Sequence, residues 1–139
     1  MIQAFLQLNH LAVWTTALVG FLLGWLWFGP LCGRAWMAEM KFTEVDIAAA
    51  KPRMARLFAL GFLFTLLATY GLAVLITAHR SPGWLKGAEF GAFVGALVVG
   101  ARILNGALWE NRSTRLQAIV VGYEIALFTL QGAIFGVWR

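Results

Sequence analysis

Four long apolar segments, separated by short polar connections, make up most of the chain. The segments 11–33 and 57–78 contain no charged side chain. In 85–109 the charges are Lys86 and Glu89, close to its start, and Arg102, whereas 116–138 contains only Glu124. A helix needs about 20 mostly apolar residues to cross the hydrocarbon core of a bilayer. The pattern therefore predicts four transmembrane helices, at approximately residues 10–31, 56–78, 85–109 and 116–138.

The connections are short, so we predict an all-α fold in which residues 1–139 form a single transmembrane domain, a four-helix bundle. The longest connection contains Thr43 before Glu44 and Asp46, which is typical of a helix start. We therefore expect a short interfacial helix between the first two spanning helices, ended by Pro52. No Lys or Arg precedes His10, which favours a retained first helix over a signal peptide.

Composition agrees with a membrane protein and excludes two other classes. Of all residues, 61% are hydrophobic and only 12% are charged, whereas a soluble domain has about a quarter of its residues charged. The net charge of +5 comes from basic residues scattered between apolar segments, which excludes a nucleic-acid-binding patch. The expected partner is the lipid bilayer. The single cysteine, Cys32, excludes an intramolecular disulfide and a multi-cysteine metal site.

Lysine and arginine are unevenly divided between the two sides of the predicted bundle. Because cytoplasmic loops are enriched in Lys and Arg, we predict that both termini lie outside the cytoplasm. Arg80, Lys86 and Arg139 lie on the side of the termini, whereas the other side holds Arg34, Lys41, Lys51, Arg53, Arg56, Arg112 and Arg115.

Small residues recur at spacings of four in all four helices, a pattern that lets helix backbones approach closely in a membrane. Chance and simple packing explain most such stripes in a chain with 15 glycines. The repeat Gly87–Gly91–Gly95 is the best candidate for contact with a second subunit. The first two helices carry Ala12, Thr16, Gly20 and Gly24, and then Gly61, Thr65, Thr69 and Ala73.

Polar side chains within the third and fourth segments form the main candidate site. Arg102 and Glu124 lie at matching depth in two antiparallel helices, so we expect them to form an ion pair facing the bundle interior. Two roles remain open. The pair fixes helix register, or it belongs to a polar pathway or ligand site in which Glu124 exchanges a proton. The other members of the expected cluster are Asn105, Gln117, Tyr123 and Gln131.

No arrangement of residues indicates catalysis, a cofactor or a metal ion. A nucleophile with a neighbouring base, a phosphate-binding loop and a dinucleotide fingerprint are all missing from the sequence. His10 and His79 are expected near the outer surface, where an interfacial position is favoured over metal ligation. The sequence thus predicts a protein that is not an enzyme and has no cofactor.

The segment GWLWFGPLCGRAWM, residues 24–37, resembles the G-x-x-W-Y-x-P-x-x-F-G-K-x-W-M motif of the bacterial membrane family called domain of unknown function 1761. Asn9, Asn105 with Glu110, and Gly122–Tyr123 are also similar to the family. Phe28 and Arg34 stand where Tyr and Lys are common, and Glu124 stands where Gln is more frequent. The motif residues in this chain are Trp27, Phe28, Gly29, Pro30, Gly33, Arg34, Trp36 and Met37.

The resemblance implies four helices in the bacterial inner membrane and a basic, aromatic cytoplasmic loop, but no established activity. Because Gln is more common at position 124, an acidic group there does not support an activity shared by the family. Physically, the motif suits an interfacial turn, with tryptophans at headgroup depth and Arg34 near lipid phosphate. A docking surface for another protein is the alternative.

Two functions fit these features. The favoured one is a non-enzymatic membrane protein that acts as an oligomer or as an accessory subunit of a larger membrane complex. The alternative is a small homodimeric transporter or channel around Arg102 and Glu124. A subunit should co-purify with a fixed partner, whereas a transporter should have a water-accessible cavity that reaches Glu124. A lipid-modifying enzyme would need a catalytic arrangement that the sequence lacks.

Overall fold

The computed structural model describes residues 2–79 and 83–138. Within this part the chain is helical apart from short turns, and it contains no strand. Four helical segments are long and apolar enough to cross a membrane, which confirms the predicted all-α membrane fold. They are α2 (His10–Leu26) with η1 (Trp27–Leu31); α4 (Glu44–Ala50) with η2 (Lys51–Arg53) and α5 (Met54–His79); α6 (Trp84–Phe93) with η3 (Val94–Gly100) and α7 (Ala101–Trp109); and α8 (Thr114–Val137).

Local capping interactions explain where several helices begin. The side chain of Asn9 accepts a hydrogen bond from the Ala12 N–H at the start of α2. Thr43 and Asp46 form a capping box at α4, and Ser113 caps α8 by accepting from the Leu116 N–H. Such caps satisfy N–H groups that have no partner within the helix. Two short helices complete the fold, α1 (Ile2–Leu6) and α3 (Gly33–Glu39).

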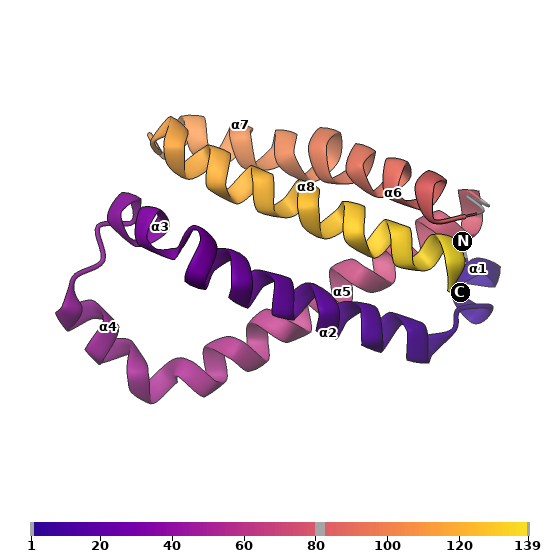
Figure 1. The fold of residues 1–139 in the computed structure, drawn as a ribbon, viewed down its shortest axis with the longest axis horizontal. Coiled ribbons are helices and arrows are strands. Elements are labelled where there is room, and N and C mark those ends of the chain that lie inside the picture. Colours follow the sequence, from indigo (N-terminus) through magenta and orange to yellow (C-terminus); the bar gives the residue numbers. More distant parts are fainter. Residues whose placement is uncertain (1, 80–82, 139) are drawn as a thin grey trace.

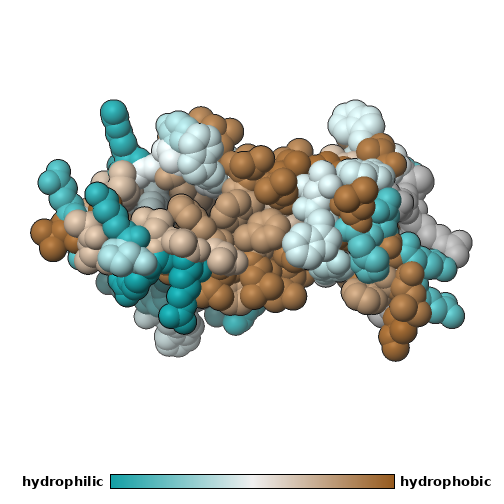
Figure 2. All heavy atoms as spheres, turned by 90° about the horizontal axis from the view of Figure 1, so that it is seen from below, coloured by the Kyte–Doolittle hydropathy of each residue, from teal (hydrophilic) through white to brown (hydrophobic). Residues whose placement is uncertain are grey.

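The helices run back and forth along one long axis (Figure 1). Both ends of the chain lie at one end of the bundle, whereas α3, α4 and the α7–α8 turn lie at the other, which we call the loop end. The short helix α4 is steeply inclined to α5, as expected for an interfacial helix. Figure 2 shows a broad hydrophobic middle between ends that carry the most hydrophilic side chains. This distribution matches a molecule whose middle lies in lipid.

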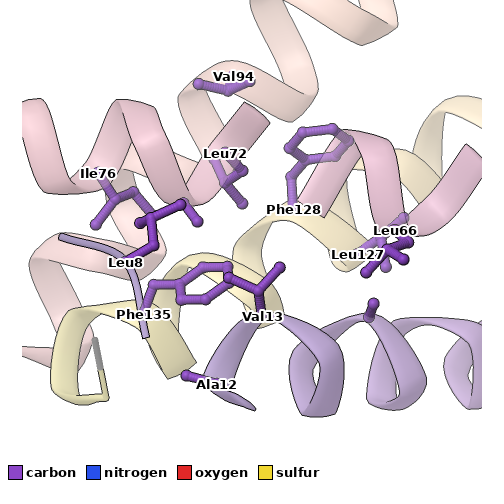
Figure 3. Packing of buried hydrophobic residues seen from close by; sticks show 12 residues of the cluster. Leu8, Ala12, Val13, Leu66, Leu72, Ile76, Val94, Leu127, Phe128 and Phe135 are labelled. Atoms are coloured by element: carbon purple, nitrogen blue, oxygen red, sulfur yellow. The ribbon is translucent and has the colours of Figure 1, made fainter. Parts of the chain in front are cut away.

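The apolar core is concentrated in the half of the bundle near the termini. Val13, Leu72 and Ile76 are almost completely buried there, together with Phe135 of α8 (Figure 3). Towards the loop end the fully buried part of the core ends at Leu66 and its neighbour Leu127, and partly buried residues such as Phe62 and Tyr123 continue it. The bundle is therefore packed closely around α2, α5 and α8 at one end and more loosely at the other.

The closest helix contact joins α6 to α8, and it is made by glycines. A Cβ atom on Gly91 would lie 2.0 Å from the backbone oxygen of Phe128, and one on Gly87 would lie 2.1 Å from that of Gly132. Helix backbones this close leave no room for a side chain. The stripe Gly87–Gly91–Gly95 is covered by α8 of its own chain, so the expectation that it contacts a second subunit is wrong. The spacing alone could not tell these two partners apart.

Candidate functional site

The polar groups of α8 lie on different sides of the bundle, and one of them is fully enclosed. Gln131 is 1% exposed, and its Nε2 donates a hydrogen bond of 2.8 Å to the Thr69 hydroxyl of α5. Thr69 in turn donates to the Thr65 carbonyl oxygen at 2.7 Å. Buried polar groups inside a membrane protein need such partners because lipid offers none. This contact therefore fixes α8 against α5.

Thr16 of α2 belongs to the same buried region. Its hydroxyl oxygen and Gln131 Oε1 are both enclosed without a hydrogen-bond partner in the described part of the chain. Gly20 makes room for the amide, since a Cβ there would lie 2.7 Å from Gln131 Nε2. The sequence pattern grouped Thr16 and Thr69 with the small residues. It did not reveal that they accompany Gln131 in the centre of the bundle.

Tyr123 connects α8 to the aromatic motif at the loop end. Its hydroxyl lies 2.9 Å from where a Cβ on Gly24 would be, so Gly24 provides its space. The ring of Phe28 packs edge-on to Tyr123, with centroids 4.9 Å apart, and also against Trp36 at 5.6 Å. Trp27 donates a hydrogen bond of 3.1 Å from its indole N–H to the Ile119 carbonyl. The motif thus attaches the end of the first spanning segment to α8.

The backbone of η1 explains this geometry. Pro30 has no N–H, so it cannot continue a regular helical ladder. Instead the Cys32 N–H donates to the Trp27 carbonyl, the wider spacing of a π-helix. Gly33 follows at the turn. A Cβ atom at this position would lie only 2.6 Å from the Phe28 carbonyl oxygen, so the close approach of the backbone requires glycine. The remaining motif residues lie around this turn: Gly29, Pro30 and Arg34 are exposed, and Met37 is half-buried.

The predicted ion pair between Arg102 and Glu124 is wrong. Both residues are described, and no ion pair joins them. Arg102 is exposed on α7, as is Asn105, whereas Glu124 is half-buried on α8. The expected polar cluster, held together by an ion pair, is therefore not formed. Gln117 is separate again, since its Nε2 donates to the Arg112 carbonyl oxygen at 3.1 Å.

The π-helix η3 causes this separation. In a regular helix Arg102 would share a face with Gly95, which packs on α8, because the two are seven residues apart. The turns of η3 contain more residues, so the next glycine against α8 is Gly100, whose Cβ would lie 3.1 Å from Val121. The buried position that follows is Ala107. The depth of Arg102 was predictable from the sequence, but its direction was not.

Glu39 links the two connections at the loop end, which the sequence pattern did not indicate. The Ser113 hydroxyl donates a hydrogen bond to its carboxylate, and the Arg115 guanidinium lies 3.8 Å from it.

In the part of the chain that is described, no three His, Cys, Asp or Glu side chains are grouped so that they could hold a metal ion. The Nδ1 atom of His10 lies 3.2 Å from the hydroxyl oxygen of Tyr70, within hydrogen-bond distance.

Comparison with known proteins identifies the family. A family model described as "Protein of unknown function (DUF1761)" matches residues 11–136, and thus all four spanning segments. No curated protein and no solved structure matches the chain. The matched region includes the aromatic motif and every polar residue of α8 discussed above. The chain is therefore a multi-pass membrane protein that belongs to the DUF1761 family.

Proposed function

We propose that the chain is a non-enzymatic subunit whose bundle is completed by a helix of another membrane-spanning chain, either in a homo-oligomer or as an accessory subunit of a larger complex. The observation that carries this proposal is the exposure of α5 near the loop end. Residues 55–60 are exposed on every side of the helix. A helix of a finished four-helix bundle would bury one face along its whole length.

The unpacked part continues the inward face of α5. Ala55, Phe58 and Ala59 precede Phe62 by seven, four and three residues, so they lie on its side of the helix. Phe62 packs against Trp14 and Phe21 of α2. Phe58 also meets Phe21, yet it is 53% exposed. The inward face is thus apolar and uncovered where α5 leaves the rest of the bundle.

Glu124 supports the same proposal. It lies on the side of α8 that carries Gln131, seven residues nearer the loop end. Gln131 contacts α5, and α5 diverges from α8 towards the loop end (Figure 1). No described residue pairs with its carboxylate. A charged or polar group within a membrane needs a partner, and a donor from a neighbouring chain would supply one.

We further propose that the membrane is the bacterial inner membrane and that the loop end faces the cytoplasm. The bias of basic residues supports this orientation, since α3, α4 and the α7–α8 turn hold most of them. A transporter around Arg102 and Glu124 is not retained as a proposal. No ion pair joins its two charges, so the paired polar site on which it depended is not formed in the described part of the chain.

The experiment is to determine the mass of the gently solubilised protein and of two tryptophan variants. We expect a mass above the 15.3 kDa of one chain, either a multiple of it or one chain plus a fixed companion. Ala59→Trp fills the uncovered inward face and should release the single chain. Phe64→Trp, on the opposite, 64% exposed face of α5, should leave the mass unchanged. A single-chain wild type, or an Ala59→Trp variant with unchanged mass, would refute the proposal.

A further inference from the structure

A surface groove between α7 and α8 contains the guanidinium group of Arg102, which we predicted from the sequence to form an ion pair with Glu124. Val98, Val99, Ile103 and Val120 form its apolar walls, and Arg102 lies among them. Its volume is about 520 Å³, far more than the roughly 30 Å³ of one water molecule in the liquid. The groove can thus accommodate a ligand with both a polar group and an apolar part.

The charge within the groove is positive. Glu110 and Arg112 line its loop end, but they form an ion pair with each other. Arg102 has no such partner among the described residues, so its charge remains uncompensated. It lies seven residues inside Trp109, about 10 Å along the helix from the end of α7. An unpaired charge at this depth favours an anion as its partner.

The walls of the groove indicate what kind of anion fits. Valine and isoleucine walls suit the acyl chain of a lipid that already lies in the bilayer, whereas a free ion would have to lose its water against them. Gly106 widens the groove, because a Cβ there would have only Glu110 Oε1 nearby, at 4.0 Å. The planar guanidinium of arginine matches a phosphate through two parallel hydrogen bonds. Basic sites between membrane helices bind anionic lipid headgroups in this way.

We propose that this groove binds an anionic phospholipid, with Arg102 contacting the phosphate and the valine and isoleucine walls contacting an acyl chain. The site is distinct from the uncovered face of α5 and does not depend on the proposed subunit role. It also explains why Arg102 lies on the outside of the bundle. There it faces the lipid from which the ligand would come.

The test is native mass spectrometry of the detergent-solubilised protein titrated with phosphatidylglycerol, with zwitterionic phosphatidylcholine as the reference lipid. The wild type should retain phosphatidylglycerol preferentially. Arg102→Gln should reduce this preference about tenfold, because it removes a charge-assisted hydrogen bond to phosphate. Gly106→Leu keeps the charge but fills the groove, and should reduce retention of both lipids. Arg56→Gln removes a basic residue outside the groove and should have no effect.

Further outcomes would overturn the proposal. If Arg102→Gln and Arg56→Gln reduce the preference for phosphatidylglycerol equally, the lipid is attracted by the overall charge and not by the groove. Displacement of the lipid by inorganic phosphate would assign the groove to a free anion. A changed oligomer mass in Arg102→Gln with unchanged lipid retention would make the groove a protein contact. Arg102→Lys keeps the charge but not the planar fork, so its preference for phosphatidylglycerol should lie between those of the wild type and Arg102→Gln. If Arg102→Lys loses the preference completely while its elution in size-exclusion chromatography is unaltered, the role of charge is contradicted.

Discussion

At the scale of single residues, a hydrogen bond between two polar side chains joins helices whose contact surfaces are mostly apolar. Gln131 of α8 reaches Thr69 of α5 and lies in the space that Gly20 of α2 leaves open. Leucine against leucine does not drive association in lipid, so a hydrogen bond and close backbone contact carry more of the specificity. The sequence showed that Gln131 was inside a spanning segment. It could not show which helix supplied the partner, because that depends on the rotation of each helix.

We expect Thr69→Val to lower the stability of the protein, because it leaves Gln131 Nε2 without its acceptor in a buried site. The loss should be about 0.6 kcal/mol and at most about 1.7 kcal/mol, the range for hydrogen bonds between membrane helices. Thr129→Val is the control, since the Thr129 hydroxyl bonds only to the Ile125 carbonyl of its own helix. Thermal unfolding in detergent measures both, and equal effects would refute a specific role for the Gln131–Thr69 contact.

At the scale of elements, α8 is the helix around which the others are arranged. Its glycines meet α6, its Tyr123 and Gln131 occupy spaces left by glycines of α2, and Gln131 also bonds to α5. Hydropathy predicted the four spanning segments because a bilayer requires long apolar helices. It could not predict η3, whose wider turns shift Arg102 off the packed face of the helix that carries Gly100 and Ala107. A pattern based on 3.6 residues per turn fails wherever the helix changes its period.

Gly91→Ala should separate α6 from α8, because the added Cβ would lie 2.0 Å from a backbone oxygen that cannot move independently. We expect a loss of about 1–3 kcal/mol or more in stability, as for other overpacked contacts. Gly71→Ala is the matched control, since a Cβ there meets nothing within 4 Å, and alanine also favours the helix. The midpoint of thermal unfolding in detergent compares the two. A Gly91→Ala variant as stable as Gly71→Ala would contradict the glycine contact.

At the scale of the whole molecule, the bundle is closed at the end of the termini and open at the loop end. The buried hydrophobic cluster extends from Leu8 to Leu66, whereas residues 55–60 of α5 lie outside it. Glu124 and Arg102, the two charges deepest in the spanning segments, both lie nearer the loop end and do not form an ion pair with each other. Composition identified the membrane class, but it could not show which half of the bundle is incomplete. That asymmetry follows from the direction in which α5 leaves α8.

The most direct test of the proposed subunit role is photo-crosslinking in the native membrane. A photoreactive amino acid in place of Ala59 would lie on the uncovered inward face of α5, and one in place of Phe64 on the opposite face. We predict that irradiation at position 59 yields a discrete protein adduct, a second copy of this chain or one companion of fixed mass, while position 64 yields chiefly lipid adducts. Lipid adducts alone at position 59 would contradict the account.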